Sequence, residues 1–414
     1  MKKETIGKAE ESRVHWEELE GWVRGQIQRL IQELLEEGVT QFLGRARWRR
    51  RTPLDGGEGY RNGYGKPRRL TLGAGTVEVR RPRVRNTEEG FESRVLPLFV
   101  RRTHRVRDLI PTLYLHGLAE GDFDLALRGL LGDRAPVSAS TVARLKERWH
   151  VEYATWRRRS LEDLEVVYLW VDGVYVKAGL EKEKAAVLVA MAGVTDGRKV
   201  VVAIEPGYRE STESWSALLR DLKTRGMGCP CLVIGDGHLG IWGALRNVFP
   251  EVDEQRCWNH KVLNVMDRLP KRAHAQAKPW LCSIPYGATR EEAEARRDAF
   301  VRWCQENRYG TAAETLVRDW DRMVAFYSYP EAHWSHIRTT NPLESPFAAL
   351  RLRTDAAKRY KRVDRATALI WKLLMVAETR FRSLKRRDLL PGIYRERFNP
   401  QATEERPILE EVAA

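Results

Sequence analysis

The sequence is poor in cysteine, which excludes a fold held together by disulfides. It has five cysteines in 414 residues, irregularly spaced at Cys229, Cys231, Cys257, Cys282 and Cys304. Small disulfide-stabilised domains carry many more cysteines in much shorter chains. We therefore expect all five thiols to be reduced.

Long apolar segments are also missing. No run of residues approaches the roughly 20 apolar positions that a membrane-spanning helix requires. The first residues, MKKETIGKAEESRVHWEELE, lack the apolar stretch of a secretory signal. There is likewise no glycine-rich loop of the kind that cradles nucleotide phosphates. These absences predict a cytoplasmic protein with no membrane partner and no requirement for ATP.

Negative charge is in deficit, and the excess positive charge is concentrated in two segments. The chain has 72 Lys and Arg against 57 Asp and Glu, a net charge of +15. Residues 41–110 contain 18 Lys and Arg against 7 Asp and Glu, and residues 351–397 contain 15 against 5, so the rest of the chain is mildly acidic. Either segment alone is typical of a solvated helical surface. Two such segments together favour a polyanionic partner such as nucleic acid.

At 414 residues the chain is too long for one core, and we expect several domains. Apolar residues at helical spacing predict an amphipathic helical region in residues 1–44, which either packs against its own domain or forms a dimerisation arm. Residues 45–104 are predicted to form a basic loop followed by a small β-hairpin. Arginines interleaved with tyrosines suit contacts with phosphates and bases, although a flexible basic linker has the same composition. The candidate contacts are Arg49, Arg50, Arg51, Arg61, Arg68 and Arg69.

Residues 105–160 have the pattern of three short helices. This is the layout of a helix-turn-helix domain whose third helix reads DNA, although three short helices also occur in many unrelated folds. The third helix has Ser138 as a candidate N-cap. Its candidate DNA contacts are Ser140, Thr141, Arg144 and Lys146.

From Val166 onward, three β-rich runs are followed by a helix and by the buried strand CLVIGD. This element order is that of a ribonuclease H-like core, in which the last of these strands lies beside the first. We therefore predict a multidomain α/β fold with a mixed five-stranded sheet and flanking helices. The core covers residues 161–260 and 337–400, the latter with basic C-terminal helices. Residues 261–336, rich in tryptophan, are predicted to form an all-α insertion.

Two aspartates end apolar strands, where a charge carries a desolvation cost unless it is paired or binds a metal. Asp172 and Asp236 each precede a glycine, and Asp-Gly is typical of hairpin turns. We interpret the same pair at Asp55 and Asp196 as turns. Asp236 does not fit a hairpin because a helix follows it, whereas VYLWVDGVYVK around Asp172 fits either a hairpin or one strand with a glycine kink.

In a ribonuclease H-like core the two strands are adjacent, so Asp172 and Asp236 would meet. Neighbouring carboxylates repel each other unless a cation lies between them, and Mg²⁺ suits oxygen ligands together with phosphate substrates. A third acid is needed to hold two ions roughly 3.5–4 Å apart for displacement at phosphorus. Glu344 in RTTNPLESPF is the candidate. The structural alternative is a capping box, in which Asn341, Pro342 and Glu344 are N-cap, N1 and N3.

Three blocks of sequence resemble the bacterial mutator-like insertion-sequence transposases, which are DDE enzymes with a ribonuclease H-like core. The blocks are VDGVYVK, GDGHLGIWGALRNVFPEVDEQRCWNHKVLNV and HWSHIRTTNPLESPFAALRLRT. The resemblance runs from about Tyr60 to about Phe381, with the same order and spacing throughout. It places the family's catalytic, metal-binding acids on Asp172, Asp236 and Glu344.

The resemblance implies metal-dependent DNA cleavage and strand transfer by a two-metal mechanism, with two Mg²⁺ ions or with Mn²⁺ in their place. It also implies double-stranded DNA partners, namely terminal inverted repeats and target DNA, and a homodimer or larger synaptic complex associated with the bacterial nucleoid. Alternative functions are a non-catalytic DNA-binding regulator and a ribonuclease H-like nuclease without strand transfer.

The resemblance places the family's Cys/His signature on Cys257 and His260. This Cys-x₂-His spacing is half of a zinc site, but no second close pair follows, so a structural or DNA-contacting role is favoured. We interpret Trp258, which lies between them, as a core residue. The alternative hypothesis is that its ring stacks on a base displaced from the DNA. Arg351 and Arg353 are candidate phosphate contacts about two helical turns after Glu344, or else part of a solvated helix face.

Overall fold

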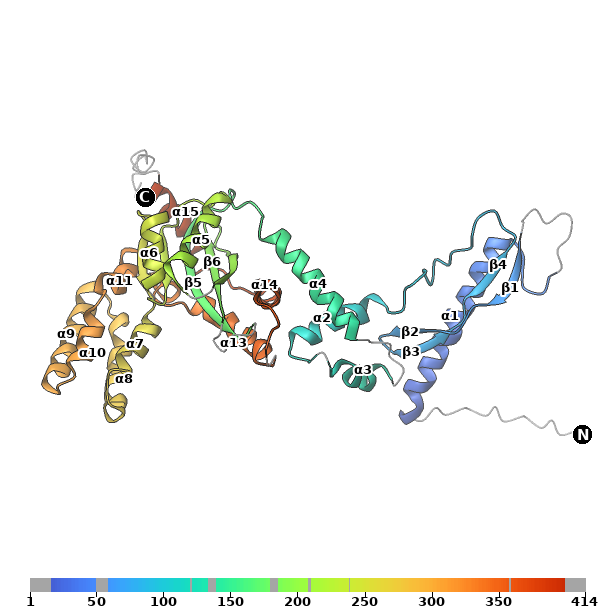
Figure 1. Ribbon diagram of the computed structural model, residues 1–414, viewed down its shortest axis with the longest axis horizontal. Helices are drawn as coiled ribbons and strands as arrows, with labels where there is room; N and C mark the ends of the chain where they lie inside the picture. Colours follow the sequence, from blue (N-terminus) through green and yellow to red (C-terminus); the bar gives the residue numbers. More distant parts are fainter. Residues whose placement is uncertain are drawn as a thin grey trace, which may run out of the picture. The chain divides into compact units, whose positions relative to one another are not determined.

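The computed structural model describes residues 16–49, 59–119, 121–132, 139–178, 185–207, 210–237, 239–356 and 359–398 (Figure 1). The chain divides into two compact units, residues 1–145 and residues 146–414. Arg50 and Arg51, two of the predicted DNA contacts, lie outside the described residues.

In the first unit a long helix packs against antiparallel strand pairs. Helix α1 ends at Gly44, whose φ of 64° is in the left-handed region that glycine adopts without strain. Leu35 of α1 packs against Leu70 and Val77 of the β2–β3 hairpin, so this part of the apolar stripe is buried within its own unit. The elements are α1 (Leu19–Leu43), β1 (Tyr60–Tyr64), β2 (Arg68–Leu72), β3 (Gly75–Val79) and β4 (Pro82–Arg85), with β1 paired to β4.

Three further helices follow in the order expected from the sequence. They are α2 (His104–Leu115), α3 (Phe123–Leu131) and α4 (Ala139–Trp156), the last of which continues into the second unit. Helix α3 buries Phe123, Leu127 and Leu131, a four-residue spacing that places all three on one face. Helix α2 buries Val106, Ile110 and Tyr114 with the same spacing, so both helices have one apolar face.

The second unit is built on a mixed five-stranded sheet, which confirms the predicted α/β sheet. Its strand order is β7-β6-β5-β8-β9, with antiparallel pairing from β7 to β5 and parallel pairing from β5 to β9. The segment around Asp172 is one continuous strand and not a hairpin, because Asp172 pairs with Val189 inside the β5–β6 ladder. The strands are β5 (Val166–Val176), β6 (Ala185–Val194), β7 (Lys199–Gly207), β8 (Leu232–Gly235) and β9 (Asp253–Arg256).

Helices cover the sheet, which explains why β5 reads as an unbroken apolar run. Leu169 and Val171 of β5 belong to a core with helices α5 (Thr212–Thr224) and α6 (Leu239–Val248). Trp170, between them in sequence, donates its indole N–H to the carbonyl of His336 at 2.9 Å. Both faces of the strand are therefore buried.

An all-helical segment follows β9, and Figure 1 shows its first helices gathered at one end of the unit. The described residues 258–337 contain α7 (Trp258–Met266), α8 (His274–Ser283), α9 (Arg290–Glu306), α10 (Gly310–Val317), α11 (Trp320–Val324) and α12 (Glu331–Ile337). Trp280, Phe300 and Trp303 pack their rings together in a small core of their own. The chain then returns to the sheet with α13 (Asn341–Ala356), α14 (Val363–Glu378) and α15 (Leu390–Phe398).

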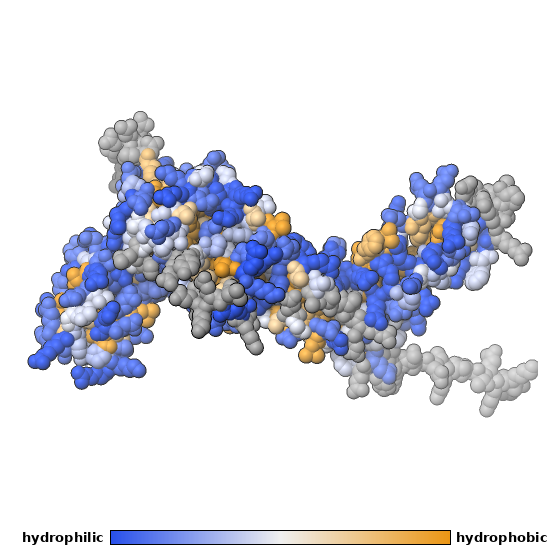
Figure 2. Space-filling model, viewed as in Figure 1, coloured by the Kyte–Doolittle hydropathy of each residue, from blue (hydrophilic) through white to orange (hydrophobic). Residues whose placement is uncertain are grey.

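The molecular surface is mainly hydrophilic on the face shown in Figure 2. None of the described helices combines the length and the apolar character needed to cross a membrane.

Gly240 at the start of α6 is sterically required, and we predict that Gly240→Ala is destabilising. A Cβ there would overlap the carbonyl oxygen of Glu210 and lie 2.8 Å from the carbonyl carbon of Ser211. Because backbone atoms cannot rotate away, the expected loss is about 2–3 kcal/mol of unfolding free energy in urea denaturation. The matched control is Gly392→Ala in α15, which meets nothing within 4 Å and should gain up to about 1 kcal/mol. Equal stability of Gly240→Ala and wild type would contradict this packing.

Candidate active site at the carboxyl ends of strands β5 and β8

The predicted aspartates meet at one edge of the sheet. Strands β5 and β8 are parallel, with Trp170 opposite Ile234, so two residues further along Asp172 comes level with Asp236. Asp172 is only 9% exposed, and its Oδ1 accepts a hydrogen bond of 2.7 Å from the N–H of Gly173. Burial, followed by the negative charge of Asp236, raises the pKa of Asp172 to about 7. A buried carboxyl beside a second carboxylate is an arrangement that a cation would stabilise.

A glycine follows each aspartate because a charged side chain occupies the place of its Cβ. At Gly173 a Cβ would overlap the carboxylate of Glu210, which is 3% exposed. At Gly237, with a φ of 95°, it would overlap the guanidinium of Arg256, which is 8% exposed. Each aspartate therefore has a buried charged neighbour.

Sequence reasoning missed Glu210 and Arg256 as parts of this site. Glu210 comes directly before the start of α5, where Ser211 caps the helix by accepting from the N–H of Ser214 at 3.2 Å. Its charge contributes to the raised pKa of Asp172. The available signal was indirect: a glycine after Asp172 within a strand needs a close neighbour to explain it.

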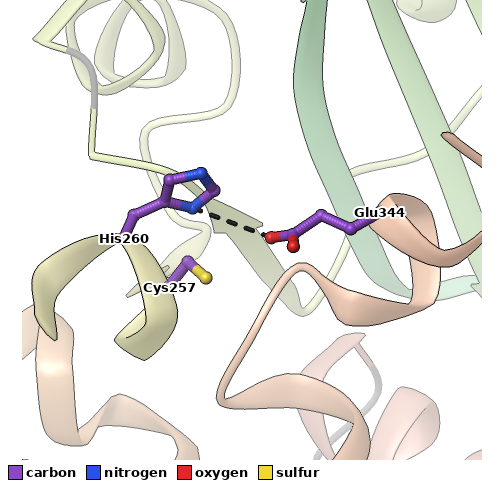
Figure 3. A group of neighbouring side chains, drawn as sticks. All are labelled: Cys257, His260 and Glu344. Carbon is purple, nitrogen blue, oxygen red and sulfur yellow. Dashed lines mark ion pairs between the residues drawn. The ribbon is translucent and has the colours of Figure 1, made fainter. Parts of the chain in front are cut away.

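Glu344 lies in the first turn of α13 and faces α7. Its Oε1 accepts a hydrogen bond of 2.5 Å from the hydroxyl of Thr340, and it lies 3.8 Å from Nδ1 of His260 (Figure 3). Thr340 in turn donates its backbone N–H to Sγ of Cys257 at 3.3 Å. The Cys/His signature thus contacts the start of the helix that carries Glu344. This position is compatible with both roles of Glu344, as a residue that stabilises the start of α13 and as a carboxylate that faces Asp172 and Asp236.

His260 is a second basic group near these acids, besides Arg256. Hydrogen bonding with Cys257, and then the charges of Cys257, Asp172 and Asp236, raise its pKa to about 9 against the opposing effect of burial. The charges of both aspartates act on His260, and Glu344 lies 3.8 Å from its Nδ1, so the imidazole interacts with all three predicted acids.

One candidate cluster of metal-ligating atoms is formed by the Cys/His signature and Glu344. Ligand atoms of Cys257, His260 and Glu344 all lie within 4.8 Å of one another (Figure 3). Within the described ranges, the three acids Asp172, Asp236 and Glu344 do not form a group this tight. The structure brings the two aspartates together directly, and it brings Glu344 to them through His260.

Trp258 is part of the core. It is 2% exposed, its indole N–H donates to the carbonyl of Met323 at 2.7 Å, and its ring packs edge-on against Trp320. This fits core packing. It does not fit stacking on a displaced base, because neither ring face is accessible.

The predicted DNA contacts differ widely in exposure. Arg353 is 4% exposed, which does not suit a phosphate contact. Arg61 and Arg68 are half-buried and donate to Thr40 and to the carbonyl of Val100, respectively, so both support the local fold. Thr141 and Lys146 are also half-buried. The exposed candidates are Arg49, Arg69, Ser140, Arg144 and Arg351.

Comparison with known proteins identifies relatives over most of the chain. The family described as "Transposase, Mutator family" matches residues 2–383. The transposase for insertion sequence element IS6120 of Mycolicibacterium smegmatis is 45% identical over 277 residues, covering 67% of this chain and 85% of the relative. The transposase for IST2 of Acidithiobacillus ferrooxidans is 40% identical over 62% of this chain and 87% of its own length.

A third relative spans more of the sequence. The transposase for ISRM5 of Rhizobium meliloti is 30% identical over 356 residues, which cover 84% of this chain and 85% of the relative. Together with the nearly full-length family match, this similarity includes the β5, β8 and α13 segments that carry the three acids. The chain therefore belongs to the Mutator family of transposases.

Proposed function

We propose that this chain is the DNA transposase of an insertion sequence, and that it cleaves and rejoins DNA with divalent metal held by Asp172, Asp236 and Glu344. The observation that carries this proposal is the meeting of the buried Asp172 with the half-buried Asp236 at the carboxyl ends of adjacent parallel strands in a chain of the Mutator family.

We assign the core to the ribonuclease H-like class. The strand order β7-β6-β5-β8-β9 supports this assignment, because three antiparallel strands are followed by a helix and by two strands parallel to the first. In such sheets the carboxyl ends of neighbouring parallel strands form one edge, where side chains from distant segments can share a ligand.

The donor set fits a hard divalent cation. Asp172 and Asp236 offer carboxylate oxygens, and without a cation the pKa of Asp172 is raised by burial and by its neighbour's charge. Mg²⁺ prefers such oxygen ligands together with substrate phosphates, and Mn²⁺ is the expected substitute. When bound, a pair of these ions activates the attacking oxygen and stabilises the leaving oxygen of a phosphodiester.

The chain's own residues would position the reactants. Asp172 and Asp236 would bind the cations from the sheet edge, and Glu344 would complete the site from α13. His260, positively charged by virtue of its raised pKa, would hold Glu344 near the pair. The reaction requires no covalent bond to the protein, so no nucleophilic side chain is needed.

DNA binding is assigned mainly to exposed basic residues outside the sheet. In the first unit Arg49, Arg69 and Arg144 are exposed and would contact the phosphates of terminal inverted repeats, with salt-dependent affinity. We assign the three helices α2, α3 and α4 as a helix-turn-helix-like reader of these repeats. Because two transposon ends must be joined, we propose a dimer or a larger synaptic complex.

The test is incubation of the full chain with Mg²⁺ and DNA carrying the element's ends. Cleaved and joined products that disappear in Asp236→Asn, while DNA binding persists, would establish the transposase. Cleavage without joined products would favour a nuclease. Binding of the ends without any cleavage would favour a DNA-binding regulator.

A further inference from the structure

One phenylalanine of the first unit is exposed at the tip of a strained turn. Phe99 is 89% exposed, although phenylalanine is among the residues that proteins most often bury. The turn is closed by the N–H of Val100, which donates to the carbonyl of Pro97 at 3.4 Å. The φ of Phe99 is 68°, a left-handed value for which turns normally use glycine or asparagine. Strain that persists in this way is typical of functional sites.

The turn is held on both sides by the fold of the first unit. Three residues before Phe99, Leu96 is 2% exposed in the core that α1 forms with the β2–β3 hairpin. After the turn, the N–H of Thr71 in β2 donates to the carbonyl of Arg101 at 2.9 Å. The N–H of Thr103 donates back to the carbonyl of Thr71 at 3.1 Å. The phenyl ring is therefore exposed on a fixed support.

Arginines gather at the base of this turn. Nη2 of Arg68 donates to the carbonyl of Val100 at 2.8 Å. Burial, and then the positive charges of Arg81 and Arg101, lower the pKa of Arg68. Arg101 is itself exposed to solvent. Guanidinium groups that repel one another are stabilised by an anion between them, and phosphate is an anion that arginine binds well.

We propose that Phe99 is a wedge that inserts between two base pairs of double-stranded DNA, while Arg101 binds a neighbouring phosphate. This inference rests on the proposed function and adds to it a deformation of the bound DNA. Apolar wedges of this kind enter from the minor groove, unstack one base step and kink the duplex. Because pyrimidine–purine steps unstack most easily, the wedge would favour such a step without any hydrogen bond to a base.

The substitution Phe99→Gly removes the ring and relieves the strained backbone. Glycine adopts a positive φ freely, so the variant should melt at the wild-type temperature or slightly above it. Any loss of DNA deformation would then not result from misfolding. The matched control is Trp22→Ala in α1, which removes another exposed aromatic ring of the same unit. Trp22 is 51% exposed and follows two glutamates, Glu18 and Glu20, so its surroundings do not suit DNA.

Two fluorescence measurements on a duplex that carries a transposon end test the wedge. Energy transfer between dyes at the two ends of the duplex reports bending, and 2-aminopurine placed at successive adenines reports unstacking. The wild type and Trp22→Ala should bring the dyes closer and raise the 2-aminopurine signal several-fold at one step. Phe99→Gly should do neither.

Salt dependence separates the arginine from the ring. Arg101→Gln should make the slope of the logarithm of affinity against the logarithm of salt concentration shallower by about one, because one phosphate contact is lost. Phe99→Gly should leave this slope unchanged, since an apolar ring releases no counterions.

The outcomes separate the wedge from the proposed function. If Phe99→Gly bends and unstacks the duplex as the wild type does, the wedge is wrong, while DNA cleavage by the chain still supports the transposase. If sedimentation shows that Phe99→Gly separates copies of the chain without changing DNA bending, the ring belongs to an interface between copies and the wedge is equally wrong. If the wild type does not bind the duplex at all, the proposed function fails together with the wedge.

Discussion

Replacing either aspartate of the sheet edge by asparagine should abolish strand cleavage while leaving DNA binding nearly unchanged. Asparagine preserves the volume, and in Asp172→Asn its oxygen can still accept from the N–H of Gly173. It removes the negative charge that a divalent ion requires, and metal assistance at phosphorus is worth several kcal/mol. Cleavage of end-containing DNA should therefore fall by about 10³-fold or more. Gel-shift affinity for the same DNA should change by less than about threefold.

Stability provides an independent check on Asp172→Asn. Because the folded-state pKa of Asp172 is raised to about 7, its contribution to folding is lost as the pH rises from the ordinary carboxyl value towards and through 7. In metal-free buffer at pH 8, Asp172→Asn should be more stable than the wild type, by roughly 2–4 kcal/mol. The difference should shrink at pH 5. A variant that is inactive and also less stable at pH 8 would show that activity was lost through misfolding.

Glu344→Gln should lower cleavage by about 10²-fold or more, without loss of the fold. Glutamine can still accept the hydrogen bond from Thr340, so α13 should begin as before. The lost charge removes both the ion pair with His260 and one proposed ligand of the metal. Cleavage rates at saturating Mg²⁺ and thermal unfolding together measure the two effects. The matched control is Glu331→Gln in the first turn of α12, an exposed glutamate that should be silent.

The variant Cys257→Ser tests whether Cys257 is a zinc ligand or holds Thr340. Cys257, His260 and Glu344 have ligand atoms close enough to share a metal ion, and a structural zinc would lose a thiolate in this variant. We assign Cys257 instead to holding Thr340, through the N–H that donates to its sulfur. Cys257→Ser should then retain the wild-type melting temperature within a few degrees, and chelators should not unfold either protein. A strong fall of stability on chelation would identify a zinc site and would contradict the role given to Glu344.

The strands can be predicted from the sequence because they depend on local patterns, and the meeting of the two aspartates follows from the order of the elements in the predicted core. Apolar runs with turn signals define the strands, and the helix after Asp236 excludes a hairpin there. For Asp172 the local pattern leaves hairpin and strand open, and it is the pairing with Val189 that shows one strand.

The buried charged neighbours cannot be predicted in this way. Glu210 reaches Gly173, and Asp319 reaches Arg256, across long stretches of chain. Nothing in the local pattern of either segment specifies these contacts, since an acid before a helix and an arginine at the end of a strand are usually solvated. The burial of Trp258 likewise depends on the carbonyl of Met323, which only the folded insertion presents.

Whether Asp172 and Asp236 hold the metal can be tested by locating Mn²⁺ through its anomalous scattering in crystals of the full chain bound to DNA carrying a transposon end. We expect density for the metal in contact with the carboxylates of both Asp172 and Asp236, with Glu344 turned towards it. Metal bound only among Cys257, His260 and Glu344, with both aspartates left without a cation, would contradict this expectation.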